Sequence, residues 1–252
     1  MKQLHPAFVA VVSAAIVLFA IGCGGGGNST PGGNTTPLAC GPNFLTPNYV
    51  QATDPGDNQP NKILTWPGFP INVYFASNQV NTYGGNSYDT NDIFWAAMQR
   101  WVAASSGNMV VTQVGSSSGA DITVDVNQLS TAPGGGGTLG FTQVTYYPST
   151  GQIVSAHVTI NTWPGMTAAQ FQDGLKATCT HEFGHALFLQ GHSDDSLDNM
   201  YYQGSSSLDK PLTQRDQNSF LTAYCGTFAS RSRARGETGE QPVTVTIECK
   251  GH

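Results

Sequence analysis

Charged residues are scarce in this 252-residue chain. They make up 10% of it, against about a quarter in ordinary soluble domains. Lysine and arginine together number only 10, and the formal net charge is −6. A surface that binds nucleic acid needs clustered basic side chains to meet the phosphates. The composition therefore argues against nucleic acid as a partner.

Glycine, by contrast, is abundant, with 30 residues. Serine, threonine and asparagine are also frequent. Such a composition suits an exported protein with many turns and exposed β-structure better than a helical cytosolic enzyme. The length allows one domain of ordinary size, with residues left over for appendages.

The first 22 residues have the order of a secretory signal peptide. A basic start is followed by an apolar run at 7–21, broken only by Ser13, which is too short to favour a membrane-spanning helix. The run ends in Ala20-Ile21-Gly22-Cys23, which resembles the lipobox of bacterial lipoproteins. The resemblance implies a lipid anchor on Cys23 and a place on the bacterial cell envelope. A plain secretory signal with an incidental cysteine is the alternative.

The composition divides the chain into four parts. After the signal peptide (1–22), residues 23–61 are rich in glycine, threonine and proline, and we predict a flexible linker that buries no core. Residues 62–226 are expected to form one compact domain. Residues 227–252 are expected to form a flexible tail with a terminal strand.

The densest cluster of metal-binding residue types begins at His181-Glu182-Phe183-Gly184-His185. Two histidines four residues apart leave the same face of a helix and can share one metal ion. Glu182 lies beside that face, where its carboxylate can reach a metal-bound water as a general base. We expect Gly191 to stop the helix in a left-handed conformation and to return His192 to the metal. Three imidazoles and one open position are typical of catalytic zinc.

This stretch resembles the zinc-binding motif of the metzincin metalloproteases, H-E-x-x-H-x-x-G-x-x-H. His-Glu-Phe-Gly-His-Ala-Leu followed by Gly-His-Ser is most similar to the matrixin branch. The chain departs from the family pattern twice. Phe188 stands where the family has glycine, and the third histidine falls one residue late, at His192. We interpret this as a one-residue insertion that moves the turn glycine to Gly191 and affects the geometry of the third ligand.

The resemblance implies two supporting residues. Asp198-Asn199-Met200-Tyr201 is similar to the methionine turn of the family, which would make Met200 a hydrophobic floor beneath the metal, since a thioether is a poor ligand beside three imidazoles. An ordinary core methionine is the alternative. Tyr202 has the offset of the tyrosine that binds the metal or steadies the transition state in astacins and serralysins. The resemblance implies that its phenol points at the zinc, and a packed loop tyrosine is the alternative.

The resemblance extends from about Lys62 to about Cys225. It implies an α+β fold, in which a twisted mixed β-sheet packs on the active-site helix and a further helix closes the domain. Periodicity and β-propensity predict strands at 71–75, 109–114, 121–126, 141–147, 153–160 and 243–247. Helical spacing predicts helices at 90–104, capped by Thr90 or Asn91, at 167–190 with a break at Gly174, and at 212–224. The family's peptide-binding edge strand would be residues 154–161 here.

The cysteines beyond Cys23 are four: Cys40, Cys179, Cys225 and Cys249. They allow two disulfides in three connectivities, and a Cys179–Cys225 bridge would join the active-site helix to the last helix. Cys40-Gly41-Pro42 is also similar to the Cys-Gly-x-Pro segment that keeps matrixins latent. Its flanking arginine and aspartate are missing, so we favour a disulfide.

Three further features have plainer interpretations. His157 stands where matrixins bind a structural zinc, but the other ligands of such a site are not recognisable, so a simple strand residue is predicted. Asp194, Asp195 and Asp198 could be calcium ligands, but they lack the spacing of a calcium loop. A solvated turn is therefore predicted, and Ca²⁺ stays an unsupported alternative. The glycine run at 134–137 lacks the features of a phosphate site and is predicted to be a mobile surface loop.

Together these residues predict a zinc-dependent endopeptidase with one catalytic Zn²⁺, a monomer acting on protein or peptide substrates. His181, His185 and His192 would hold the metal, and Glu182 would be the general base. One alternative is a catalytically impaired metzincin-fold lipoprotein used for surface binding or adhesion, which the Phe188 departure favours. Another is a zinc hydrolase that acts on something other than peptides.

Overall fold

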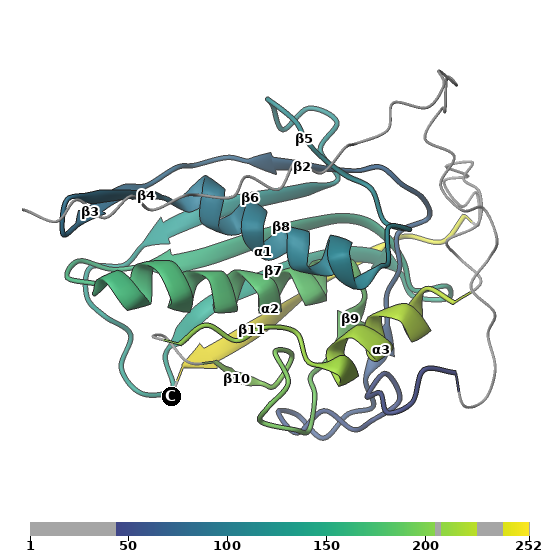
Figure 1. Ribbon diagram of the computed structural model, residues 1–252. Helices are drawn as coiled ribbons and strands as arrows, with labels where there is room; N and C mark the ends of the chain where they lie inside the picture. The colour runs from purple at the N-terminus through teal and green to yellow at the C-terminus, as the bar shows by residue number, and fades with distance from the viewer. Residues whose placement is uncertain (1–43, 205–207, 226–238, 252) are drawn as a thin grey trace, which may run out of the picture. The chain divides into compact units, whose positions relative to one another are not determined.

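The computed structural model describes residues 44–204, 208–225 and 239–251 (Figure 1). All of them belong to one compact unit, residues 33–252. The predicted signal peptide, the lipidation site at Cys23 and the Cys40 segment lie outside the described residues. Within the described ranges, no helix is both long and apolar enough to cross a membrane.

The described residues form an α+β fold around a seven-stranded mixed sheet of order β10-β11-β7-β8-β6-β2-β5. Four neighbouring strands, β8, β6, β2 and β5, run parallel. Strand β7 is antiparallel to both β8 and β11, and β10 is parallel to β11. The strands are β2 (Ile71–Phe75), β5 (Val111–Gln113), β6 (Ile122–Gln128), β7 (Thr138–Tyr147), β8 (Gln152–Thr162), β10 (Gln203–Gly204) and β11 (Val243–Gly251).

Each strand predicted from periodicity is present. In β2 the side chains of Ile71, Val73 and Phe75 are buried, and the residues between them are half-buried, as expected for a strand with one face on the core. Two small ladders lie outside the main sheet: β1 (Lys62–Ile63) pairs with β9 (Leu189–Gln190), and β3 (Val80–Tyr83) with β4 (Asn86–Asp89). The latter hairpin falls in a segment whose polar residues suggested only a loop.

Strand β8 is not the edge of the sheet, so the prediction for residues 154–161 is wrong. It pairs with β6 on one side and with β7 on the other. The next strand outward is β7, whose outer side is covered by β11 (Figure 1). The predicted strand near the end of the chain is therefore confirmed, and its main partner is β7.

The helices are α1 (Thr90–Ala104), α2 (Leu175–Leu187) and α3 (Gln214–Ala223). The bounds of α1 are those predicted, but its cap is Asp89, whose carboxylate accepts from the Asn91 amide. Ahead of α2 lies a π-helical turn, Gln170–Gly174, so Gly174 marks a change of helix type instead of a gap between two helices. Helices α1 and α2 contact each other, and α2 packs on β7 and β8 (Figure 1).

The packed domain begins earlier than the predicted boundary at Lys62. Tyr49 and Val50 are buried in the core. The Tyr49 hydroxyl donates to the Asp216 carboxylate at 2.6 Å, and its amide donates to the Ser219 hydroxyl at 2.9 Å. Both partners lie on α3, so residues 44–61 form part of the domain and not of a linker. The polar composition of this segment gave no indication that Tyr49 and Val50 are buried in the core.

Phe188, the departure from the family pattern, is a core residue. Its ring lies 5.2 Å from that of Trp101 on α1 and 5.5 Å from that of Phe220 on α3, measured between centroids. It is fully buried, so it anchors the end of α2 between two other helices. A glycine at position 188 would leave the space between Trp101 and Phe220 unfilled.

The predicted bridge between Cys179 and Cys225 does not form. Cys179 is a free thiol buried in α2, and Cys249 is also free and buried. Cys225 takes part in a disulfide whose partner lies outside the described residues. The active-site helix is instead joined to its neighbours by packing and by hydrogen bonds such as that from the Trp101 indole to the Thr180 carbonyl, 2.8 Å.

Candidate metal centre

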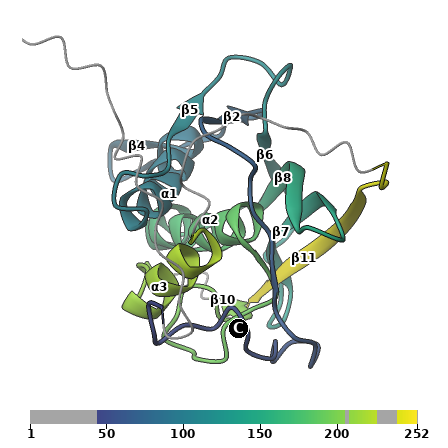
Figure 2. The same ribbon diagram turned by 90° about the vertical axis from the view of Figure 1, so that its right-hand side faces the viewer.

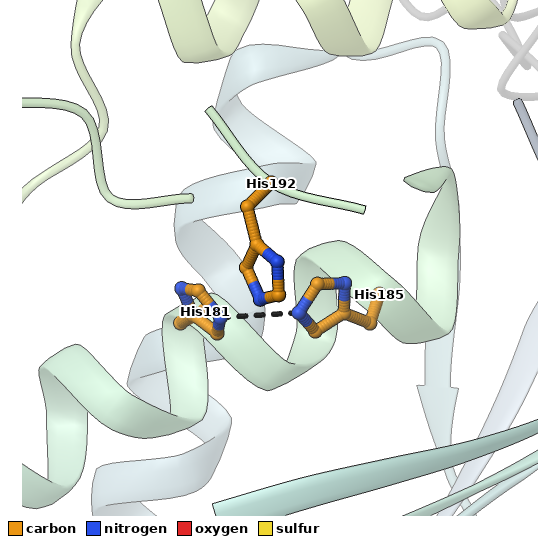
Figure 3. Close-up of side chains that lie close together, drawn as sticks. All are labelled: His181, His185 and His192. Carbon is orange, nitrogen blue, oxygen red and sulfur yellow. Dashed lines mark hydrogen bonds between the residues drawn. The ribbon is translucent and has the colours of Figure 1, made fainter. Parts of the chain in front are cut away.

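Helix α2 presents His181 and His185 from the same face on consecutive turns, as their spacing predicts. The two side chains are almost completely buried. Their Nε2 atoms lie 3.1 Å apart, and Figure 3 shows the His192 ring descending between them. The centroid of the His192 ring lies 5.4 Å from that of His181 and 5.0 Å from that of His185. The three imidazoles predicted as ligands are therefore brought together.

The chain returns His192 to this cluster by a route that differs from the predicted one. Helix α2 ends at Leu187, not near Gln190, and β9 follows in place of another helical turn. Gly191 is therefore not the helix stop. It has φ of +118°, and a Cβ there would lie 2.0 Å from the Asn61 Oδ1. Glycine is required at this turn by both its conformation and the close approach of Asn61.

Each imidazole is oriented through its Nδ1 atom. His181 donates to the Asn199 carbonyl at 2.8 Å and His185 to the Leu189 carbonyl at 2.9 Å. His192 donates to the Asp54 carboxylate, with Nδ1 2.9 Å from Oδ2 and 3.2 Å from Oδ1. With the proton on Nδ1, each ring keeps its lone pair on Nε2. The buried Nε2 of His192 has no hydrogen-bond partner among the described residues.

Burial keeps two of the histidines neutral. It lowers the pKa of His181 to about 3 and that of His185 well below its usual range. Burial of Asp54 opposes its ionisation, but the hydrogen bond and charge interaction with His192, together with the hydrogen bond from the Gly56 amide, outweigh burial and lower the pKa of Asp54. Ionised Asp54 can therefore accept the Nδ1 proton of His192, and His181 and His185 are uncharged, as metal coordination requires.

The donor set fits a zinc ion. Zinc bound by histidine nitrogens at about 2.0–2.1 Å in a tetrahedron places neighbouring nitrogens about 3.3 Å apart. The 3.1 Å between the Nε2 atoms of His181 and His185 is close to this value. The unpartnered Nε2 of His192 supplies the third donor. Three imidazoles leave one tetrahedral position for water or substrate, as in catalytic zinc sites.

Glu182 lies beside this cluster and is completely buried. Its Oε2 accepts from the Thr142 hydroxyl on β7 at 2.6 Å, and its stem packs on Gly140, where a Cβ would come within 3.1 Å of Cγ. Burial raises the pKa of Glu182 to about 8. A nearby metal cation would favour its ionised form. The residue is therefore placed to exchange a proton beside the metal position.

Met200 packs against α2 at Gly184, which lies between His181 and His185 in the sequence. A Cβ on Gly184 would fall 2.1 Å from the Met200 Sδ, so the glycine between the two histidines makes room for the thioether. Asp216 on α3 holds this turn, because its carboxylate accepts from the amides of Asn199 at 2.8 Å and Met200 at 3.3 Å. The turn also carries the carbonyl that orients His181.

Tyr202 is near the cluster, with its ring centroid 6.5 Å from that of His192. Its hydroxyl interacts with that of Tyr201, and this hydrogen bond raises the pKa of Tyr201. The role of Tyr202 toward zinc stays a prediction. Tyr202 also lines a cavity of about 340 Å³ next to His192, together with residues that include Asp54 and Thr246.

The other candidate ligands of the sequence have protein partners. His157 interacts with the hydroxyls of Thr123 and Thr159, 2.6 and 3.3 Å away. Arg215 pairs with Asp194 and with Asp198, the latter at 2.9 Å. Asp194 and Asp195 are solvated as predicted, whereas Asp198 is buried. Among the described residues, neither these carboxylates nor His157 belong to a group of potential metal ligands.

Sequence reasoning missed three residues of the site: Asp54, Asn61 and Thr142. Asn61 holds the His192 backbone at both ends, donating to its carbonyl at 2.8 Å and accepting from its amide at 3.1 Å. Asp54 precedes its histidine by 138 positions, so no spacing rule connects them. In the sequence, Asp54-Pro55-Gly56 predicts a turn, but it does not indicate that Asp54 contacts His192.

Comparison with known proteins adds no relative. No protein-family model matches the chain, and no curated protein matches it either.

Proposed function

We propose that this protein is a zinc-dependent endopeptidase with a metzincin-like catalytic domain. The observation that supports it best is the convergence of the Nε2 atoms of His181, His185 and His192, each fixed from its Nδ1 side, next to the Glu182 carboxylate. Additional support comes from the packing of Met200 against Gly184 of α2 and from α3, which holds the methionine turn.

The proposed mechanism assigns a task to each residue. A zinc ion held by the three histidines would lower the pKa of a water at its open position and polarise the scissile carbonyl. Glu182 takes the proton of the attacking water and delivers it to the leaving amine. Thr142 fixes one oxygen of Glu182, which leaves Oε1 for this exchange. Asp54 holds the proton of His192 on Nδ1, so the Nε2 lone pair would be available to the metal.

The setting is also a proposal. The lipobox-like Cys23 supports a lipid-anchored protein of the bacterial cell envelope, and we propose a monomer whose partners are protein or peptide substrates. Phe188 is the feature that favoured an impaired binding protein. It packs on Trp101 and Phe220, and His192 still lies next to the rings of His181 and His185. It therefore gives little support to that alternative.

The test is zinc content measured together with proteolysis on the full mature chain. We expect about one zinc per chain, cleavage of unfolded casein, loss of cleavage with a chelator and recovery with added Zn²⁺. Zinc binding without cleavage, in the parent and in the strand-released variant described below, would contradict an endopeptidase. A protein without zinc would contradict the metal centre itself.

A further inference from the structure

Strand β11 occupies the outer edge of β7, beside the metal centre. The pairing is antiparallel and continuous from Val243 opposite Tyr146 to Cys249 opposite Gly140. Figure 2 shows β11 along the outer side of β7. On its other side the last two residues of β11 pair with β10. Strand β11 therefore lies in a slot between β7 and β10.

The glycine loop at 134–137 closes one end of this slot. The Gly251 amide donates to the Gly137 carbonyl at 2.7 Å, and the Gly136 amide donates to the Gly251 carbonyl at 2.8 Å. All these contacts are between main-chain groups, so they recognise an extended backbone and not a particular sequence. The loop predicted to be mobile is in fact hydrogen-bonded to the last residue of β11.

The slot passes directly over the proposed catalytic residues. Gly140, opposite Cys249, contacts Glu182. The Cys249 sulfur, a Glu182 carboxylate oxygen and a His181 ring nitrogen all lie within 4.8 Å of one another. Cys249 is 1% exposed and Glu182 is 0% exposed. A second polypeptide cannot reach Glu182 from this side while β11 is in place.

The inward side chains of β11 become smaller toward its end, where the strand passes Glu182 and β10. Ile247, Cys249 and Gly251 face inward and are buried, whereas Thr246, Glu248 and Lys250 are exposed. A Cβ on Gly204 of β10 would come 2.9 Å from the Cys249 sulfur, so the slot has little room for a larger side chain there. The first half of β11 is mostly exposed and is held mainly through its backbone.

We propose that β11 is an intramolecular occupant of the peptide-binding slot and that substrate binds along β7 only after β11 has left. This inference rests on the proposed endopeptidase function. It names the surface that takes the substrate, an extended polypeptide with a small side chain next to Glu182, and the segment that keeps the site closed. A tethered strand competes at an effective concentration on the order of mM, so it resists displacement by dilute substrate.

The first experiment locks the strand in the full chain. Thr145 and Thr244 are directly opposite each other, with hydroxyl oxygens 2.8 Å apart on the exposed face, so Thr145→Cys combined with Thr244→Cys can form a cross-strand disulfide. We expect the oxidised form to cleave casein about tenfold or more slowly than the reduced form. The parent and Thr244→Cys alone, under the same reductant, control for reduction of the disulfide at Cys225. Equal rates in both forms would overturn the inference.

The second experiment releases the strand. Ile247→Asp places a charge on the buried face of β11 and should raise the cleavage rate, whereas Val243→Asp, at a residue that is 40% exposed, should not. A fluorescein-labelled peptide of sequence 243–251 should bind to Ile247→Asp and not to the parent, as measured by anisotropy. Failure of that peptide to bind a folded, zinc-loaded Ile247→Asp protein would refute the slot.

The two proposals can fail separately. Peptide binding to Ile247→Asp with no cleavage by any form would retain the slot and reject the endopeptidase. Chelator-sensitive cleavage at the same rate in the parent, locked and released forms would retain the endopeptidase and reject β11 as its occupant.

Discussion

Replacing Asp54 by asparagine tests how the third histidine is made into a ligand. The Asp54 carboxylate accepts the Nδ1 proton of His192 at 2.9 Å and also accepts from the Gly56 amide at 2.7 Å. An asparagine can keep the bond to Gly56 with its carbonyl oxygen, so the loop should stay folded. Its amino group would then face Nδ1 of His192 and favour the tautomer that carries the proton on Nε2. That proton would occupy the position of the metal.

The expected loss can be estimated from this geometry. Removing a carboxylate that orients a metal-binding histidine lowers metal affinity by about 10–100-fold, or about 1.4–2.7 kcal/mol. We expect Asp54→Asn near the upper end, because it presents a donor to Nδ1 and both side chains of the pair are less than 10% exposed. Asp54→Ala should lie lower in the range, since it removes the acceptor without presenting a donor.

The assay is competition for Zn²⁺ with a chromophoric chelator. Asp57→Asn is the matched control, because the exposed Asp57 carboxylate accepts only from the Gln59 amide in the same loop, at 2.8 Å. His192→Ala gives the affinity of a site without its third ligand. If Asp54→Asn binds zinc as tightly as the parent and Asp57→Asn, Asp54 does not set the tautomer of His192.

Four further outcomes are expected. Glu182→Gln should keep zinc, retain an acceptor for the Thr142 hydroxyl and lose about 10²–10⁴-fold in kcat for casein; cleavage at the parent rate by the zinc-loaded variant would reject the general base. Gly184→Ala should lower the Tm in calorimetry. The gain in helix propensity is about 1 kcal/mol, but the new Cβ would lie 2.1 Å from the Met200 sulfur, and displacing that sulfur costs about 1–3 kcal/mol. A Tm at or above that of the parent would show that Met200 moves freely. Tyr202→Phe should lower kcat with unchanged zinc content, and an unaltered rate would leave Tyr202 as a packed loop residue. Chelation should lower the Tm, because zinc at 100 times its Kd stabilises the folded state by about 2.7 kcal/mol, and an unchanged Tm would mean that the folded protein holds no metal.

The sequence alone determined the features that depend on local geometry. The four-residue spacing of His181 and His185 places both on one side of any helix, and Glu182 follows from its place between them. The bounds of α1 and the presence of the sheet strands also follow from periodicity. The approach of His192 to the other two histidines was also predicted from its place after Gly191, although the helix ends earlier than expected.

Only the tertiary structure decided the contacts between distant segments. Asp54 meets His192 because residues 49–61 pack on α3 and on the turn after β9, which no spacing rule indicates. Phe188 departs from a family pattern in sequence but fills the space between α1 and α3. Strand β11 was predictable as a strand, yet its partner was not, because the alternation of its side chains shows which face is buried but not which strand lies beside it. The register that places Cys249 beside Glu182 is therefore a property of the folded sheet.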